Sequence, residues 1–252
     1  MLGENCRAYP VRQEARIHII GMEPEGLSTR DLRFSRLFSH CALLVGGDRQ
    51  LKTLDGPLPP NVERLTIRGK MDPIVDRLQT FQESLSPEVA IVLASGDPLY
   101  HGIGSTLIRK IGREKLAFYP APTLVQRAFS LLGLPWEEST VVSFHRPDSP
   151  ERIPETGKSC LLAFYTDGAE GPRKVLSAIN KDLALQKRLK EIAVLENIGL
   201  EDQAITVFER ERADMLQERK FAPLNVVVVT LNPADRTRIS VLVMRPFLGT
   251  VK

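Results

Sequence analysis

Long apolar runs are missing from this chain of 252 residues. Runs such as those at 41–45 and 226–231 have the length of a β-strand, whereas a membrane-spanning helix needs about 20 apolar residues. Residues 1–16 contain no apolar stretch of the kind that a secretory signal has. We therefore expect a cytoplasmic protein that makes no contact with a membrane.

Cysteine is scarce as well, with three widely spaced residues and no C-x-x-C pair. Such an odd and sparse set indicates reduced thiols rather than a disulfide framework. The four histidines show no ligand-like spacing with the cysteines, so no metal site is expected. The net charge of +3 is too small to indicate nucleic acid, although its arginines would suit an anionic small molecule.

Motifs of several common enzyme classes are also absent. There is no Gly-Lys-Ser/Thr phosphate loop, no G-x-G-x-x-G spacing after the first apolar run and no G-x-S-x-G nucleophile elbow. With 42% hydrophobic and 26% charged residues, the composition is that of an ordinary globular protein. The length suits one large domain or two modest ones.

Apolar strand-like runs alternate with amphipathic helical segments along the chain. The continuous apolar run at 88–95 is typical of a strand that is covered on both faces. The other expected strands are 16–21, 41–46, 62–67, 115–119, 140–144, 160–165, 191–195, 224–231 and 239–244. The expected helices are 29–39, 72–85, 103–111, 123–132 and a long basic helix at 173–190. This alternation predicts an α/β fold, in which ligands bind at the carboxyl ends of the strands.

A proline-rich stretch interrupts the pattern after residue 146. It holds Pro147, Pro150 and Pro154 among almost no apolar residues, which is typical of a linker. We therefore expect a loose extension at 1–15, an α/β domain at 16–146, the linker at 147–158 and a second α/β domain at 159–252. Each domain would contain a mainly parallel or mixed sheet flanked by helices, with a cleft between the two domains.

The strongest local motif is the loop from Ser95 to Gly104, which connects the buried run to the next helix. Gly96 permits a tight turn and a close approach of the backbone to a ligand. Asp97 can cap the helix, with Pro98 in its first position, or its carboxylate can hold a polar ligand together with exposed N–H groups. An ordinary strand-to-helix turn explains these residues at least as well as a ligand site does.

Other strand ends carry weaker candidates. The turn at 21–26 follows the first strand, and Glu196-Asn197 ends a strand in the second half. Thr123 and Gln126 have the spacing of a capping box at the start of a helix. Turns and caps account for each of these features without a ligand.

Five short segments carry a family resemblance when they are taken in order. They are Val45-Gly46-Gly47-Asp48-Arg49-Gln50-Leu51, Leu93-Ala94-Ser95-Gly96-Asp97-Pro98-Leu99, Leu132-Gly133-Leu134-Pro135-Trp136, Leu195-Glu196-Asn197-Ile198-Gly199 and Leu224-Asn225-Val226-Val227. Together they resemble the tetrapyrrole methylases, from about Arg16 through nearly the whole chain. Within that family the chain is similar to the enzymes that methylate C5 of a precorrin, of the cobalt-precorrin-7 type, in cobalamin biosynthesis.

The resemblance implies two α/β domains, a homodimer and S-adenosylmethionine as the methyl donor in the cleft between the domains. It also implies an anionic tetrapyrrole as substrate and a separate decarboxylating partner for methylation at C15. The cofactor-binding residues that it implies are Pro24, Ser95, Gly96, Asp97, Tyr100, Thr123, Leu124, Thr166 and Asn197. Arg49 and Arg146 are candidates for binding substrate carboxylates, and no residue is singled out as a catalytic base.

Two departures from the family pattern concern the substrate side. Glu23 and Glu25 stand where family glycines are frequent, which predicts a narrower or more acidic pocket. Residues 143–146, Ser-Phe-His-Arg, lack the glycine of the corresponding family segment. The alternatives are another activity on this fold (a different corrin position, diphthamide synthesis or ribosomal RNA ribose methylation) and a non-catalytic α/β module that binds a nucleotide-like ligand.

Overall fold

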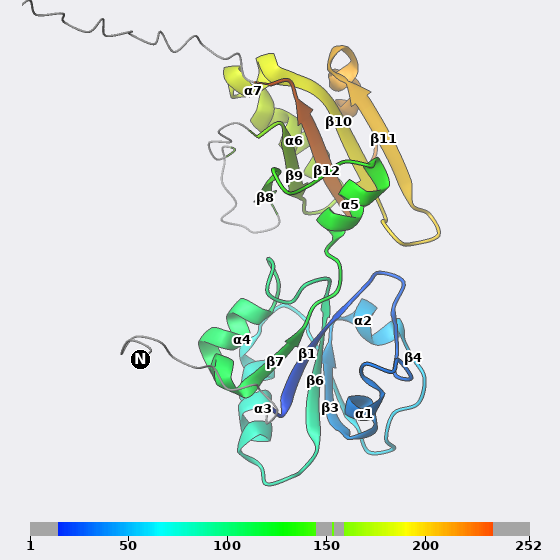
Figure 1. Cartoon of the computed structure of the whole chain (residues 1–252), viewed down its shortest axis with the longest axis vertical. Coiled ribbons are helices and arrows are strands. Elements are labelled where there is room, and N and C mark those ends of the chain that lie inside the picture. Colours follow the sequence, from blue (N-terminus) through cyan, green and yellow to red (C-terminus); the bar gives the residue numbers. More distant parts are fainter. Residues whose placement is uncertain (1–14, 145–152, 154–158, 234–252) are drawn as a thin grey trace, which may run out of the picture.

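The computed structural model describes residues 15–144, 153 and 159–233. Two five-stranded sheets, each with its own helices, form two halves that lie one above the other in Figure 1. Residues 1–14 of the expected extension and the expected strand at 239–244 lie outside the described residues. In the described part of the chain, every helix is too short or too polar to span a membrane.

The first half is built on a wholly parallel sheet with the strand order β5-β3-β6-β1-β7. Its strands are β1 (Ile17–Met22), β3 (Cys41–Gly46), β5 (Glu63–Thr66), β6 (Val89–Ser95) and β7 (Leu116–Tyr119). The central strands β1 and β6 are buried almost throughout, which explains their continuous apolar sequences. A two-stranded parallel sheet of β2 (Leu27–Ser28) and β4 (Leu54–Asp55) lies beside it.

Helices cover both faces of this sheet. Its helical segments are α1 (Ser35–Ser39), α2 (Asp48–Lys52), α3 (Asp72–Glu83), α4 (Gly104–Ile111) and the 3-10 turn η1 (Arg113–Lys115). Leu78 of α3 and Leu107 of α4 pack on one face, and Phe38 of α1 and Leu51 of α2 pack on the other. Of the helix expected at 29–39, only the last five residues are helical, as α1.

The second half is built on a mixed sheet with the strand order β11-β10-β12-β9-β8. Its strands are β8 (Thr140–Ser143), β9 (Leu161–Tyr165), β10 (Leu189–Glu196), β11 (Ala204–Glu209) and β12 (Asn225–Leu231). Neighbours are antiparallel except for β8 and β9, which are parallel. The two sheets thus match the expected α/β architecture, one parallel and one mixed.

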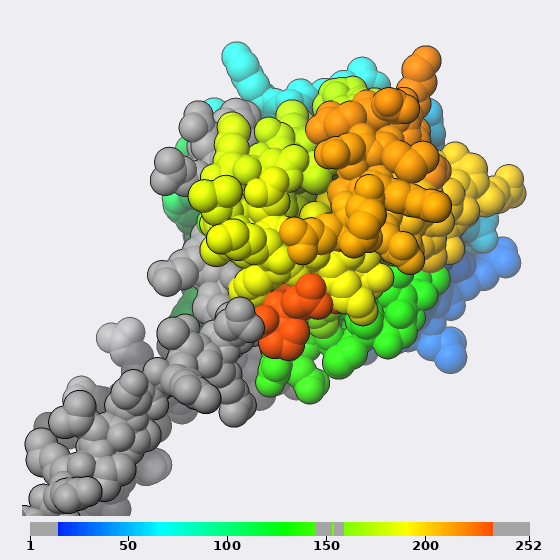
Figure 2. All heavy atoms as spheres, turned by 90° about the horizontal axis from the view of Figure 1, so that it is seen from above, coloured from blue at the N-terminus to red at the C-terminus, as the bar shows by residue number. Residues whose placement is uncertain are grey.

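The second sheet is also covered on both faces. Its helical segments are α5 (Leu124–Leu132), α6 (Gly171–Asn180), α7 (Leu183–Arg188) and the 3-10 segment η2 (Arg210–Gln217). Segments α6, α7 and η2 share one buried cluster with the sheet, and α5 packs on the opposite face through Val125 and Phe129. Figure 2 looks down on this half and shows the chain from α6 to η2, in yellow to orange, gathered over it.

The single long helix expected at 173–190 is wrong. The segment folds as α6 and α7, because the Asp182 side chain accepts the N–H groups of Ala184 and Leu185 and so starts a new helix. The last residues of the segment, from Leu189 on, already belong to β10.

The chain crosses from the first sheet to the second between β7 and α5, earlier than expected. Helix α5 packs into the core of the second half, and β8 pairs with β9. The expected linker at 147–158, of which only Ile153 is described, therefore connects two strands of one sheet rather than two domains. A proline-rich composition indicates an exposed connection, but it does not say which sheet receives the next strand.

Candidate functional site

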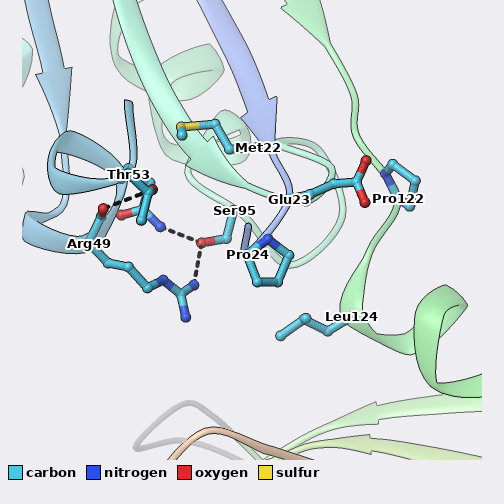
Figure 3. Close-up of a pocket in the computed structure, with 10 residues that line it drawn as sticks. Met22, Glu23, Pro24, Arg49, Thr53, Ser95, Pro122 and Leu124 are labelled. Atoms are coloured by element: carbon cyan, nitrogen blue, oxygen red, sulfur yellow. Dashed lines mark hydrogen bonds between the residues drawn. The ribbon is translucent and has the colours of Figure 1, made fainter. Parts of the chain in front are cut away.

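A hollow lies at the carboxyl ends of β1 and β6, which we call the first hollow. Its wall includes Glu23 and Pro24 after β1, Arg49 of α2, and Ser95 and Gly96 at the end of β6. Figure 3 shows Arg49 and Glu23 on opposite sides, with Ser95 and Pro24 between them. This is the edge where an open parallel sheet binds ligands.

A second hollow adjoins the first and shares Pro24, Arg49 and Leu124 with it. The rest of its wall comes from the second half, with Leu195, Asn197, Ile198, Leu224, Asn225 and Val226. The two hollows together therefore run from the strand ends of one sheet to those of the other. The first offers charged groups, whereas the second is mainly apolar.

Two glycines bring the strand ends close together at the first hollow. The Gly96 N–H donates to the Met22 carbonyl at 2.9 Å, and the Ala121 N–H donates to the Gly96 carbonyl at 3.3 Å. Gly96 has φ +58°, a left-handed conformation that favours glycine. At Gly21 a Cβ atom would lie 2.0 Å from the Gly96 oxygen, so no side chain fits there.

Arg49 presents a guanidinium group to both hollows. It donates to Ser95 Oγ at 3.1 Å, and the Gln50 side chain donates to the same oxygen at 2.7 Å. No carboxylate of the described residues forms an ion pair with Arg49. The group is thus fixed in place and remains able to bind an anion.

The loop after Ser95 is held by Asp97, whose Oδ1 accepts the Leu99 N–H at 2.8 Å. Asp97 therefore caps a turn, as one of the two interpretations expects, but Pro98 is not the first residue of a helix because α4 begins at Gly104. Neither Asp97 nor Tyr100 is among the residues that line the hollows.

The same loop reaches the second half through aromatic rings. The centroid of the Tyr100 ring lies 4.8 Å from that of His101 and 6.3 Å from that of Tyr165, at the end of β9. His101 has φ +53°, an uncommon conformation for a residue with a side chain. Burial raises the pKa of Tyr165, which keeps this phenol neutral.

The expected capping box at the start of α5 is confirmed. Thr123 Oγ1 accepts the Gln126 N–H at 3.1 Å, and Gln126 Oε1 accepts the Thr123 N–H at 2.8 Å. Thr123 is buried and its hydroxyl is engaged in this cap, whereas the next residue, Leu124, lines both hollows.

The candidates in the second half are held by internal hydrogen bonds. The buried Thr166 hydroxyl donates to the Asn225 carbonyl at 2.6 Å, and Thr166 does not line a hollow. Asn197 does line the second hollow, but its side chain donates to Asp202 at 2.7 Å. Arg146 lies outside the described residues.

Comparisons with known proteins place the chain in a family. The sequence model of the family of tetrapyrrole (corrin/porphyrin) methylases matches residues 32–214 of this chain. The chain belongs to the tetrapyrrole methylase family. It is thereby a member of a family of S-adenosylmethionine-dependent methyltransferases. Among the described residues, no group of three or more metal-binding side chains gathers around a common point.

Curated tetrapyrrole methylases with similar sequences act on precorrins. A decarboxylating precorrin-6Y C(5,15)-methyltransferase of a Sinorhizobium species is 28% identical over 228 residues, which are 88% of this chain and 51% of the relative. A cobalt-precorrin-7 C(5)-methyltransferase of Salmonella typhimurium is 26% identical over 188 residues, which are 74% of this chain and 87% of the relative. The chain thus spans about half the length of the first of these relatives.

Solved tetrapyrrole methylases share the fold. The precorrin-6Y methylase of Archaeoglobus fulgidus matches with a TM-score of 0.61 and 21% identity, over 86% of this chain and 98% of the other. A uroporphyrin-III C-methyltransferase of Thermus thermophilus, solved with S-adenosylhomocysteine, matches with a TM-score of 0.60 and 17% identity, over 86% and 97%.

The two glutamates that depart from the family pattern form an ion-pair cluster with Arg127 of α5. Arg127 Nη1 lies 3.0 Å from Glu23 Oε2, and both terminal nitrogens of Arg127 donate to Glu25. These hydrogen bonds lower the pKa of Glu25. Glu25 also lies against Gly199, where a Cβ atom would come within 2.6 Å of Glu25 Oε1. The cluster therefore connects the turn after β1 with two segments of the second half.

Sequence reasoning missed Gln50 and Arg127 as residues of this site. Gln50 lies in Val45–Leu51, one of the five segments that carry the family resemblance, so that segment could have indicated it. Arg127 had none, because its pairing with residues about 100 positions away depends on how α5 lies against the first half.

Proposed function

We propose that this tetrapyrrole methylase transfers a methyl group from S-adenosylmethionine to C5 of a precorrin of the cobalt-precorrin-7 type, in cobalamin biosynthesis. The support comes from relatives at 26–29% identity that carry this activity in their names. We assign only the C5 transfer to this chain and expect a separate decarboxylating partner for C15. We also expect the chain to act as a homodimer in the cytoplasm.

The observation that carries the proposal is the pair of adjoining hollows lined from both sheets. The donor has a zwitterionic amino-acid end and an adenosine end. The first hollow, with Arg49 and Glu23, suits the charged end, and the apolar second hollow suits a purine ring. The residues present therefore fit the donor, with Pro24, Ser95, Gly96, Leu124 and Asn197 in the walls.

The other proposed cofactor residues would act by shaping these walls. The Thr166 hydroxyl donates to the Asn225 carbonyl, so Thr166 positions Asn225 rather than donating to a ligand. Thr123 caps α5 and so positions Leu124. Asp97 and Tyr100 hold the loop that follows Ser95 and Gly96. We assign Arg49 to a carboxylate of the bound reactants and keep Arg146 as a second candidate for the substrate.

When bound, S-adenosylmethionine supplies an electrophilic methyl group. The task left to the chain is to align the acceptor carbon with it, which is worth about 7–11 kcal/mol when the geometry is good. The close packing of Gly21 against Gly96 suits that task because it holds Gly96, a residue of the wall of the first hollow, in place.

Two measurements test the proposal. Calorimetry of the purified chain should detect binding of S-adenosylmethionine and of S-adenosylhomocysteine. Incubation with labelled donor should transfer the methyl group to C5 of a precorrin, with the cobalt-containing and metal-free substrates offered in parallel. Absence of donor binding would contradict the cofactor, and transfer to another macrocycle position or to RNA alone would contradict the substrate.

Replacing Asp97 by alanine should weaken donor binding while the protein stays folded. The variant loses the acceptor of the Leu99 N–H, which costs about 1 kcal/mol of stability and loosens the loop beside Ser95 and Gly96. We expect the dissociation constant of the donor to rise about fivefold, measured by calorimetry. Asp97→Asn keeps an oxygen for the turn and removes only the charge. Unchanged donor affinity in both variants would leave Asp97 as a turn-capping residue.

A further inference from the structure

The cluster of Glu23, Glu25 and Arg127 has one more carboxylate than it has cations. The neighbouring cation Arg33, which also attracts Glu23, is itself paired with Asp31. The contacts show which carboxylate of the cluster is less neutralised. Glu25 binds both terminal nitrogens of Arg127, whereas Glu23 shares a single contact at 3.0 Å. Glu23 also lines the first hollow, and about half of its side chain (48%) is exposed to solvent. The less neutralised carboxylate therefore belongs to the wall of the first hollow, and Figure 3 shows it beside Pro122, another residue of that wall.

We propose that Glu23 makes the first hollow select the cationic methyl donor over its neutral demethylated product. The inference rests on the proposed function, because it requires S-adenosylmethionine to be the ligand. Methyl transfer removes the sulfonium charge, and the amino-acid and adenosine parts of donor and product are otherwise the same. A carboxylate in the wall attracts the ammonium group of both ligands equally, but it attracts the sulfonium group only in the donor.

The other charges around the hollow do not produce this selection. Arg49 lies on the opposite side and is held by Ser95. Its attraction for a ligand carboxylate is the same for donor and product, so it cancels in the ratio of their affinities. Arg127 is paired with Glu25 and does not line either hollow. Glu23 is thus the charged group of the wall that distinguishes the two ligands.

The test compares the dissociation constants of S-adenosylmethionine, S-adenosylhomocysteine and sinefungin, an analogue with a protonated amine in place of the sulfonium group. In Glu23→Gln the preference for each cation over S-adenosylhomocysteine should fall about fivefold, equal to about 1 kcal/mol. The affinity for S-adenosylhomocysteine, which keeps the ammonium group of the amino-acid end but has no sulfonium charge, should fall less than the affinity for either cation. Glu63→Gln is the matched control. Glu63, the first residue of β5, forms an ion pair with Arg77 of α3, and the substitution removes the same charge away from the hollows. Its preference should equal that of the wild type.

Two further readouts keep the test sharp. Added salt should reduce the preference in the wild type and have less effect in Glu23→Gln, because salt screens an exposed charge. Arg127→Met should raise the preference, since it leaves both carboxylates unpaired, and thermal unfolding checks that this variant is folded. Equal changes for donor and product in Glu23→Gln would overturn the inference. Failure of the wild type to bind any of the three ligands would overturn the proposed function instead.

Discussion

Replacing Gly21 by alanine is expected to destabilise the protein by about 4 kcal/mol, beyond the usual range for a single substitution. The new Cβ atom would lie 2.0 Å from the Gly96 oxygen and 2.7 Å from the Ala121 nitrogen. Both are backbone atoms, so no rotamer change relieves the clash. Strand β1 pairs with β6 on one side and β7 on the other, which prevents it from moving away. Urea unfolding measures the loss, and donor binding should fall with it because Gly96, which the new Cβ atom would displace, lines the first hollow.

Gly47→Ala is the matched control for this prediction. Gly47 has φ −70°, which any residue adopts, and a Cβ atom there would meet only the flexible Gln50 side chain. As Gly47 is the N-cap of α2, its loss should cost about 1 kcal/mol or less. If Gly21→Ala and Gly47→Ala unfolded at similar urea concentrations, the backbone around Gly21 would have moved enough to relieve the clash, and the prediction would be wrong.

The central strands of the first half follow from the sequence because they are continuous apolar runs of strand length. The run at 88–95 is continuous since β6 is buried between helices on both faces, and this pattern needs no knowledge of partners. The secondary structure of the second half is harder to predict from its sequence. Strand β11 is not among the expected strands. It lies at the edge of its sheet, where Ile205 and Val207 are exposed, and a charged segment follows it at once.

The candidate site divides in the same way between local and tertiary features. The capping box of Thr123 and Gln126 and the turn of Asp97 are formed by residues within three positions of each other, so their spacing predicts them. The hollows themselves are not local. They depend on α5, which belongs to the second half and lines both hollows through Leu124. The sequence pattern instead indicates a crossing between the halves at the proline-rich stretch 147–158.

Replacing Arg219 by methionine is expected to cost about 3 kcal/mol of stability, because it leaves a buried carboxylate without its counter-charge. The Glu196 side chain is buried and accepts from Arg219 at 3.1 Å and from the Ala222 N–H at 2.7 Å. Arg219 also donates to the Thr206 hydroxyl on the edge strand β11. Glu196 is the last residue of β10, next to Asn197 in the second hollow, so donor binding should weaken together with stability. Urea unfolding and calorimetry measure the two effects.

A second substitution separates the charge from the packing. In the double variant Arg219→Met with Glu196→Gln, the new side chain at position 196 keeps an oxygen that accepts the Ala222 N–H but carries no charge. About half of the stability lost in Arg219→Met should therefore return. Arg33→Met is the surface control. It breaks an exposed ion pair with Asp31 and should cost less than about 1 kcal/mol. If the double variant were no more stable than Arg219→Met, the cost would lie in the contacts of Arg219 with Thr206 and with the Phe221 ring rather than in the unpaired charge.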